Sequence, residues 1–248
     1  MKNKTTKKRV DNIAVILAGG RGERMGRIYK QFLVINGKPI IFHSIDKFVK
    51  CGLIRRIIVV IPKEKYAYAQ KIIHKNYDKK NIDIIVGGKT RRDSSYNALK
   101  FIKKNKIKCD YVIFHDGARP LLTVEMINSV IREAAKYGAA VLSSGILNVI
   151  VKVEDNYIVN KYPFNTKRVH NTQTPHGYRF NWILSAHESP VNKKSESNSL
   201  ENIELVYNIG KKIRIIDKFY RNMKLTHKQD IIPIEAILKK SDKDNNFF

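Results

Sequence analysis

The feature that most constrains the fold is a short aliphatic run that breaks abruptly into glycines near the amino terminus. Residues 13–17 read IAVIL, and residues 18–22 read AGGRG. An unbroken aliphatic run of this length is typical of a strand buried on both faces. Glycines directly after such a strand let the chain turn sharply and bring backbone N–H groups close to a ligand. The pattern predicts a buried strand with a ligand-binding loop at its carboxyl end.

Two basic residues, Arg24 and Lys30, follow this loop. Fixed positive charge beside exposed backbone donors suits a triphosphate. The segment matches neither the P-loop, which needs G-x-x-x-x-G-K-[ST], nor the dinucleotide fingerprint, whose third glycine is absent here. The glycines alone are equally compatible with an ordinary turn between a strand and a helix. The two cations at this spacing favour phosphate binding.

Strand-like and helix-like segments alternate along the chain. Apolar runs predict strands at Ile13–Leu17, Ile57–Ile61, Ile82–Val86, Tyr111–His115, Ala139–Ser143 and Lys212–Ile216. Helical periodicity predicts helices at Ile40–Lys50, Lys65–Asn76, Arg92–Lys104, Val124–Lys136, Arg179–His187, Leu200–Asn208 and Lys228–Lys239. Together these segments predict one doubly wound α/β domain over residues 1–248, with a mostly parallel, Rossmann-like sheet.

The alternation is interrupted at about residues 145–170. Two short apolar runs, Val149–Val153 and Tyr157–Val159, flank a Glu-Asp-Asn turn. Apolar runs on either side of turn-forming residues are typical of a β-hairpin. We therefore predict a hairpin arm that protrudes from the sheet in this interval.

A carboxylate stands at the end of the fourth predicted strand, where ligands of open parallel sheets bind. Residues 115–120 read HDGARP, so Asp116 is followed by a glycine and then by Arg119. Asp116 is well placed to hold a divalent cation, and Mg²⁺ is favoured because it prefers few carboxylates together with phosphate and water. The alternative is that Asp116 only caps the next turn.

A second glycine pair, Gly87 and Gly88, follows the third predicted strand, and Ser94 lies in the first turn of the next helix. Exposed backbone groups with a nearby hydroxyl could read the edge of a base by hydrogen bonds. The alternative is a purely structural role, in which Asp93 or Ser94 only caps the helix.

Lys224 lies between the last predicted strand and the last predicted helix. From there its ammonium group could face the same phosphate-binding region at the strand ends. A lysine in a connecting segment is, taken alone, more often part of the solvated surface.

Composition limits the other functional classes. The chain has 48 Lys and Arg against 22 Asp and Glu, a net charge of +26. These cations are spread over the whole chain, with no recognition motif or aromatic–basic cluster, so we predict no nucleic-acid partner. No apolar run approaches the roughly 18–20 residues that span a bilayer, and the basic first residues lack the apolar part of a secretory signal. We expect a cytoplasmic protein without a membrane partner.

Five motifs in this order resemble the cytidylyltransferases that act on polyol phosphates: LAGGRGERMG with KQF, GGKTRRDS, HDGARP, TQTP and NMKLT. The resemblance extends over about residues 12–238. It implies an enzyme that uses CTP and Mg²⁺ and that forms a homodimer through the arm. Each motif is weak alone, and the set is specific.

The resemblance also implies roles for individual residues. Arg24, Lys30 and Lys224 would be catalytic, with Lys30 stabilising the transition state at the α-phosphate and Lys224 completing the phosphate clamp. The CTP-binding set would be Ala18, Gly19, Gly20, Gly22, Gly87, Gly88, Ser94, Asp116 and Arg119, with Asp116 also the metal ligand. The acceptor would be contacted by Thr174 and Arg168.

Two branches of the family are close, and they differ in the acceptor. Residues 18–20, 30–32 and 173–175 favour the ribitol-phosphate branch of wall and capsule polymers over the methylerythritol-phosphate branch of isoprenoid synthesis. The arm departs from the family pattern at Val149, where an Asp is expected, and at Thr166, where an Arg is expected. Both positions belong to the acceptor side.

The prediction is therefore transfer of CMP from CTP to a small polyol phosphate, resembling ribitol 5-phosphate, with release of pyrophosphate. The alternative acceptor is 2-C-methyl-D-erythritol 4-phosphate. Two alternatives from other classes are a basic nucleic-acid-binding protein and a CTP-binding module without catalysis.

Overall fold

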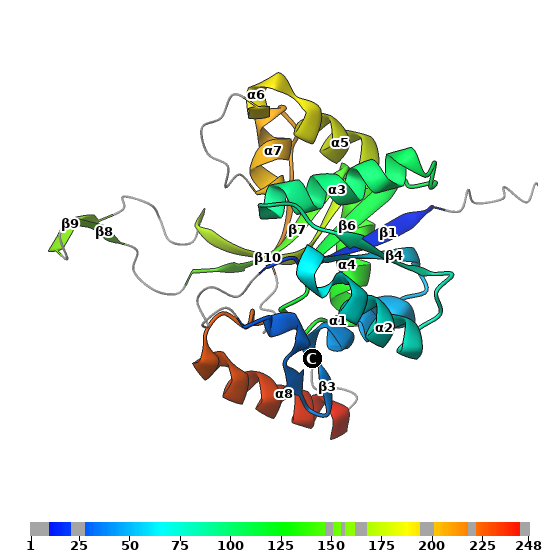
Figure 1. The fold of residues 1–248 in the computed structure, drawn as a ribbon. Coiled ribbons are helices and arrows are strands. Elements are labelled where there is room, and N and C mark those ends of the chain that lie inside the picture. The colour runs from blue at the N-terminus through cyan, green and yellow to red at the C-terminus, as the bar shows by residue number, and fades with distance from the viewer. Residues whose placement is uncertain are drawn as a thin grey trace, which may run out of the picture.

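The computed structural model describes residues 10–20, 28–146, 151–154, 157–161, 168–193, 201–217 and 222–243. Its core is a seven-stranded sheet with the order β11-β7-β10-β6-β1-β4-β5 (Figure 1). The strands are β1 (Asn12–Leu17), β4 (Ile54–Ile61), β5 (Ile82–Val86), β6 (Tyr111–Asp116), β7 (Ala139–Gly145), β10 (His170–Arg179) and β11 (Arg214–Asp217). Every neighbouring pair is parallel except the two that β10 makes with β6 and β7. The predicted mostly parallel α/β fold is confirmed.

Helices cover both faces of the sheet because the side chains of each strand alternate between them. In β1, Ala14 and Ile16 join one apolar core, while Ile13, Val15 and Leu17 join the other. The first core is covered by α1 (Ile40–Lys50), α2 (Tyr66–Asn76) and α4 (Val124–Tyr137), and the second by α3 (Arg91–Lys104), α5 (Phe180–Glu188) and α7 (Asn202–Asn208). Burial on both faces explains why the strand sequences are unbroken aliphatic runs.

The start of α3 is set by a local capping signal. The Thr90 hydroxyl accepts a hydrogen bond from the Asp93 N–H at 3.0 Å, and the Asp93 carboxylate accepts one from the Thr90 N–H at 3.0 Å. This reciprocal arrangement satisfies two of the backbone donors that a helix start leaves open. It fixes the first turn of α3, and with it Arg91 and Ser94, directly after the loop that ends β5.

The prediction missed one central strand, β10, which lies between β6 and β7. Its sequence, HNTQTPHGYR, has no apolar run and contains a proline and a glycine, which are unfavourable in strands. Packing explains the glycine, because a Cβ at Gly177 would lie 2.7 Å from Cγ1 of Val130 on α4. The strand is held by its two neighbours and by close helix packing, which local sequence does not reveal.

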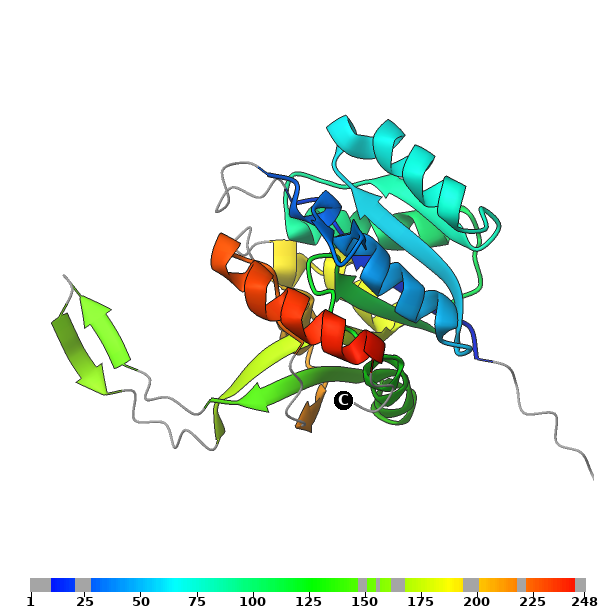
Figure 2. The same cartoon turned by 90° about the horizontal axis from the view of Figure 1, so that it is seen from below.

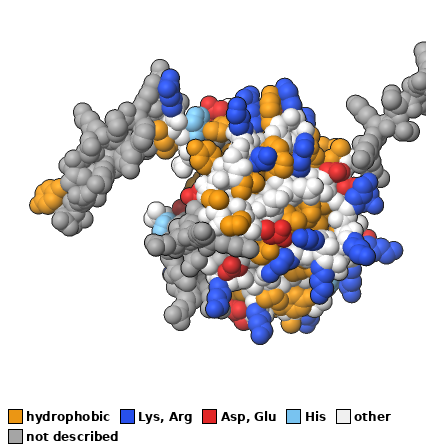
Figure 3. All heavy atoms as spheres, turned by 90° about the horizontal axis from the view of Figure 1, so that it is seen from above, with side chains coloured by type: hydrophobic (Ala, Val, Ile, Leu, Met, Phe, Trp, Pro, Cys, Tyr) orange, Lys and Arg blue, Asp and Glu red, His pale blue; other side chains and the backbone are white. Residues whose placement is uncertain are grey.

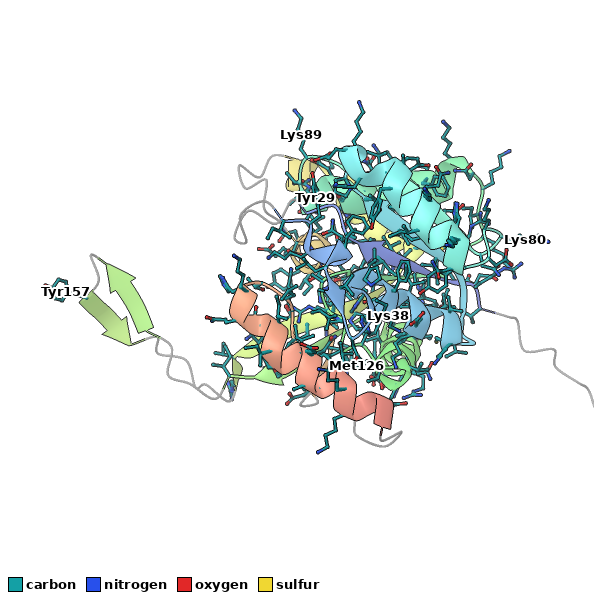
Figure 4. The ribbon with its side chains drawn as sticks, turned by 60° about the horizontal axis from the view of Figure 1, so that its bottom comes forward. Tyr29, Lys38, Lys80, Lys89, Met126 and Tyr157 are labelled. Atoms are coloured by element: carbon teal, nitrogen blue, oxygen red, sulfur yellow. The ribbon has the colours of Figure 1, made fainter. Side chains whose placement is uncertain are left out.

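The predicted arm is confirmed as a separate two-stranded antiparallel hairpin, β8 (Val151–Glu154) and β9 (Tyr157–Lys161). Figure 2 shows it projecting away from the sheet, beyond the ends of β7 and β10. Tyr157 at its turn is 77% exposed and points away from the core (Figure 4). Val149 and Thr166, the two positions that depart from the family pattern, lie outside the described residues.

A third, small apolar cluster joins the segment that follows β1 to the last part of the chain. Ile35 and Ile40 pack with Leu225 and Ile234, which come from the far end of the sequence. The elements involved are the short strands β2 (Val34–Ile35) and β3 (Lys38–Pro39) and the last helix, α8 (Ile231–Lys243), which a 3₁₀ turn, η5 (Lys228–Asp230), precedes. The remaining short elements are η2 (Lys30–Phe32), η3 (Lys63–Lys65) and α6 (Pro190–Lys193). The carboxyl-terminal segment is thereby held against the segment that follows β1 (Figure 2).

The surface carries its positive charge in scattered positions. Figure 3 shows Lys and Arg side chains distributed around one face, interleaved with acidic and apolar ones. Within the described ranges, no helix has the length and apolar character needed to cross a membrane.

Candidate active site

A cavity of about 510 Å³ opens at the carboxyl ends of β1, β5 and β6. The sheet register creates it, because Leu17, the last residue of β1, pairs with Asp116, the last residue of β6. The loops that follow these strands therefore start side by side. The wall consists of Leu17, Ala18, Gly19, Gly20, Lys30, Gln31, Gly88, Lys89, Thr90, Arg91, Ser94, Asp116, Ala118, Lys224 and Leu225.

The loop after β1 is held in place by Gln31. The Gln31 amide nitrogen donates to the Ala18 carbonyl at 2.7 Å and lies 3.4 Å from the Gly20 carbonyl. Because the amide is buried, these bonds fix the described part of the loop against η2. Lys30, the neighbour of Gln31, is placed on the cavity wall by the same short turn.

The second wall is a narrow cradle formed by Gly87, Gly88 and Ser94. The Gly88 N–H donates to the Ser94 hydroxyl at 3.1 Å, and that hydroxyl donates to the Thr90 carbonyl at 2.9 Å. A Cβ at Gly87 would lie 2.9 Å from the Ser94 oxygen, and one at Gly88 would lie 2.1 Å from Cβ of Asp93. The cradle therefore requires glycine at both positions. Its two N–H groups are bonded within the protein, that of Gly87 to the Ile61 carbonyl at 2.9 Å and that of Gly88 to Ser94, so its backbone is held rigid.

Asp116, which also lines the cavity, is the centre of a cluster of cations. Its Oδ1 accepts from Nε and Nη2 of Arg91 at 3.3 and 3.1 Å. Its Oδ2 lies 3.0 Å from Nζ of Lys224 and 3.5 Å from Nε of Arg119. We call Asp116, Arg91, Lys224 and Arg119 the charge cluster. One buried carboxylate thus holds three cations in fixed positions at the cavity.

The charge cluster keeps Asp116 ionised. Burial alone would raise the pKa of Asp116, but the charges of Arg91, Lys224 and Arg119 outweigh burial and hold that pKa well below its usual range. One carboxylate does not neutralise three cations, so the cluster retains positive charge, which suits an anionic ligand.

A buried, neutral histidine, His115, holds the backbone next to the charge cluster. Burial lowers the pKa of His115 to about 4, so its imidazole is uncharged at neutral pH. Nε2 of His115 lies 3.1 Å from the Arg119 carbonyl, which can only accept, so this nitrogen carries the proton. Nδ1 lies 3.2 Å from the Thr174 hydroxyl, which in turn accepts from the Asp116 N–H at 3.1 Å. The histidine and threonine therefore fix the backbone on which Asp116 and Arg119 stand.

The carboxyl-terminal segment closes the cavity from a distant part of the sequence. Nζ of Lys30 donates to the Thr226 carbonyl at 2.8 Å, across 196 positions of sequence. Nη1 of Arg119 donates to the Asn222 carbonyl at 2.7 Å, and the Leu225 N–H donates to the Ala118 carbonyl at 2.8 Å. These bonds place Lys224 beside Asp116.

Comparison with known proteins shows which family combines this fold and this cavity. A family model described as 2-C-methyl-D-erythritol 4-phosphate cytidylyltransferase matches residues 12–240. The proteins of that name from Bacillus mycoides and Clostridium perfringens are both 36% identical to the chain. The first match covers 90% of this chain and 96% of the relative, and the second covers 92% and 98%.

The chain belongs to the 2-C-methyl-D-erythritol 4-phosphate cytidylyltransferase family. Its fold agrees, since the solved 4-diphosphocytidyl-2C-methyl-D-erythritol synthase of Anaerococcus prevotii is 25% identical, with a TM-score of 0.78, over 93% of this chain and 96% of that one. Cytidylyltransferases of this family use CTP, so the chain is a CTP-dependent nucleotidyltransferase. The resemblance found in the motifs is confirmed. The preference for the ribitol branch is not supported, and the comparisons favour the methylerythritol alternative.

The residues that the family resemblance suggested fall into three groups. Those on the cavity wall are Ala18, Gly19, Gly20, Lys30, Gly88, Ser94, Asp116 and Lys224. Gly87 and Arg119 lie just behind it, bonded or packed against wall residues. Gly22 and Arg24 lie outside the described residues. The individual roles of all these residues remain predictions.

The two suggested acceptor residues are not on the cavity wall. Thr174 is buried, and its hydroxyl is engaged by Asp116 and His115 beneath the charge cluster. Arg168 is exposed, two residues before the start of β10. The structure therefore places Thr174 in support of Asp116, and contact of either residue with an acceptor remains a prediction.

Sequence reasoning missed Arg91, although it is the residue that holds Oδ1 of Asp116. Arg91 belongs to the GGKTRRDS motif, but only Gly87, Gly88 and Ser94 were assigned there. Its position at the first turn of a helix that follows a strand was the available signal. Gln31 was quoted only as part of a motif, and no signal in the sequence pointed to its bond with Ala18.

Asp116 does not fit the part of a preformed metal ligand in this arrangement. Both of its oxygens are already engaged, and a divalent ion there would meet the charges of Arg91, Lys224 and Arg119. Within the described ranges, no group of three His, Cys, Asp or Glu residues could hold a metal ion. The carboxylate orders the cations around it, and its part as a metal ligand and the Mg²⁺ requirement both remain predictions.

Proposed function

We propose that this protein transfers the cytidylyl group of CTP to 2-C-methyl-D-erythritol 4-phosphate and releases pyrophosphate. The observation that carries the proposal is one cavity lined by both the backbone cradle and the charge cluster, in a chain whose family match extends over residues 12–240. The acceptor follows from the names of the relatives, which this chain matches over almost their whole length.

The two sides of the cavity suit the two ends of CTP. The cradle at Gly88 and Ser94 suits the cytosine, because the bond between these residues holds the wall rigid, and a rigid polar wall can distinguish an amino group from a carbonyl on a base edge. Lys30 and Lys224 suit the triphosphate, since they stand on the wall beside the glycine loop after β1. The ribose then lies between them, near Asp116 and Arg91.

The reaction needs no protein nucleophile. An oxygen of the acceptor phosphate attacks the α-phosphorus of CTP, the new P–O bond forms, and the bond from the α-phosphorus to the bridging oxygen breaks to release pyrophosphate. The rate comes from holding the two phosphates in line and from cations that stabilise the charge in the transition state. Lys30 and Lys224 are the residues suited to that second task.

The test is pyrophosphate release with CTP and a panel of acceptors. We expect turnover with 2-C-methyl-D-erythritol 4-phosphate and much slower turnover with ribitol 5-phosphate. Identification of the CDP-linked product by mass spectrometry establishes which acceptor was used. A faster reaction with ribitol 5-phosphate would overturn the proposed acceptor, and no turnover with any polyol phosphate would overturn the transferase proposal.

Two further properties belong to the same proposal. Excess EDTA should abolish turnover, and added Mg²⁺ should restore it. Light scattering should give the mass of a homodimer, and deletion of the arm between residues 147 and 167 should give a monomer. These two measurements are independent of the acceptor panel.

A further inference from the structure

We propose that Glu201 is a positioning residue for the nucleotide cavity, and that it does so by holding the guanidinium of Arg91 beside Asp116. The inference rests on the proposed use of CTP. It assigns a role in the nucleotide site to a residue that does not line the cavity. That residue belongs to an element that the proposed chemistry does not otherwise use.

The guanidinium of Arg91 is shared between two carboxylates. Its Nε and Nη2 bond to Oδ1 of Asp116 at 3.3 and 3.1 Å, and its Nη1 bonds to Oε2 of Glu201. A planar guanidinium held at both ends cannot rotate about its own axis. With Asp116 alone as partner, Arg91 could approach the carboxylate in more than one way.

Glu201 is itself fixed, which makes it a suitable anchor. It is the cap residue of α7, where its backbone N–H donates to a carboxylate oxygen of Glu204 at 2.7 Å. The next residue, Asn202, is buried, and its side-chain nitrogen donates to the Ser95 hydroxyl of α3 at 3.3 Å. The first turns of α7 and α3 are therefore joined at two neighbouring points.

Charge gives a second reason for this role. Asp116 alone faces the three cations Arg91, Lys224 and Arg119. Glu201 adds a second carboxylate on the far side of Arg91, away from the cavity wall. It therefore relieves repulsion within the cluster without placing a negative charge where the phosphates are expected to bind.

The position of Arg91 indicates which part of the nucleotide depends on Glu201. Arg91 lies on the wall, in the same helical turn as Ser94 of the cradle, and its guanidinium shares Asp116 with Lys224 of the charge cluster. A guanidinium there faces the ribose and the first phosphate of a nucleotide whose base occupies the cradle. Misplacing it should weaken nucleotide binding more than it slows the chemical step.

The test is a double-mutant cycle on CTP affinity, measured by calorimetry without acceptor. Glu201→Gln should raise the Kd of CTP about fivefold, the size expected for a half-exposed ion pair, with a matching rise in KM and a smaller change in kcat. In an Arg91→Gln background the same substitution should have no further effect. Glu204→Gln is the matched control, because it neutralises a carboxylate one helical turn away and glutamine can still accept the capping bond.

The outcomes separate this inference from the function on which it rests. An unchanged Kd in Glu201→Gln, or an equal effect in both backgrounds together with a lowered Tm, shows that Glu201 only stabilises α7 and overturns the inference. Wild-type turnover with CTP shows in the same preparation that the proposed function stands. Failure of the wild-type protein to bind CTP overturns both.

Discussion

The cradle and the charge cluster face the same cavity but are built in different ways. Gly87, Gly88 and Ser94 lie within eight consecutive residues, and their geometry follows from sterics and one capped helix start. Asp116 and its cations come from β6, the loop after it, α3 and the segment before α8, so the cluster forms only when these elements pack together.

The difference shows how each region responds to change. The cradle has no room for a side chain at its glycines, so adding a single methyl group there disturbs its structure. The charge cluster depends on the attraction between Asp116 and its cations, so removing the carboxylate charge leaves neighbouring cations without a compensating charge. The cradle suits recognition of a base, and the cluster suits the binding and reaction of phosphates.

The largest effect should come from Asp116→Asn. Removing the carboxylate leaves Arg91, Lys224 and Arg119 without the group that orders them, and we expect turnover to fall by about 10³-fold or more, the range for breaking a buried charge pair. Steady-state kinetics measures this, and circular dichroism checks that the fold is kept. A variant that retains a tenth of wild-type turnover would show that the cluster does not depend on this carboxylate.

Lys30→Ala should lower kcat by about 10²–10³-fold, the usual size for one transition-state charge donor, and should weaken CTP binding much less. Lys80→Ala is the matched control, since Lys80 is exposed on the loop before β5 (Figure 4). A loss of less than about threefold would mean that another cation is the main donor, and Arg24 would be tested next.

The charge-cluster side should also carry an acid-sensitive contribution to stability. His115 has a pKa of about 4 in the folded protein and about 6.5 when unfolded, so the unfolded chain binds more protons between these values. The free energy of unfolding should therefore fall by about 3 kcal/mol as the pH drops from 6.5 to 4 through this group alone. Denaturant unfolding across that range measures it. His115→Gln should make the fall about 3 kcal/mol smaller, while the part due to the buried His176 and His187, whose pKa values burial also lowers, should remain.

The cradle should make the enzyme prefer CTP to UTP by about 10–100-fold in kcat/KM, because one mismatched buried polar pair costs roughly 1–3 kcal/mol. Purine nucleotides should be excluded by size. Competition between the two pyrimidine nucleotides measures the ratio directly. Comparable values would leave a nucleotidyltransferase with no base selection at the cradle.

The smallest effect should come from Gly88→Ala, with about a tenfold loss of CTP affinity and little change in kcat for bound substrate, at the lower end of the cost of overpacking. The added Cβ would lie 2.1 Å from Cβ of Asp93 and must displace the start of α3. Gly52→Ala is the control, since a Cβ there meets nothing within 4 Å. Equal affinities in both variants would show that the cradle is not where the base binds.

Local sequence determined much of the fold. The aliphatic runs of β1, β4 and β6 predicted buried strands because a strand covered on both faces must be apolar throughout. Glycine pairs and a carboxylate directly after these runs predicted a site at the strand ends, where the cavity lies. The hairpin arm followed from its turn residues. In each case the deciding interactions lie within a few residues of one another.

Tertiary structure alone decided the rest. β10 lacks any apolar run, and its place between β6 and β7 depends on pairing with strands far from it in sequence. Arg91 reaches a carboxylate 25 positions away and another 110 positions away, and Lys30 reaches Thr226 across 196 positions. A sequence specifies which charges exist, but a buried charge takes its partner from whatever packing brings within about 3 Å. The glycines in the sequence therefore indicated a nucleotide site. Which cations line that site was decided only by the packing of distant elements.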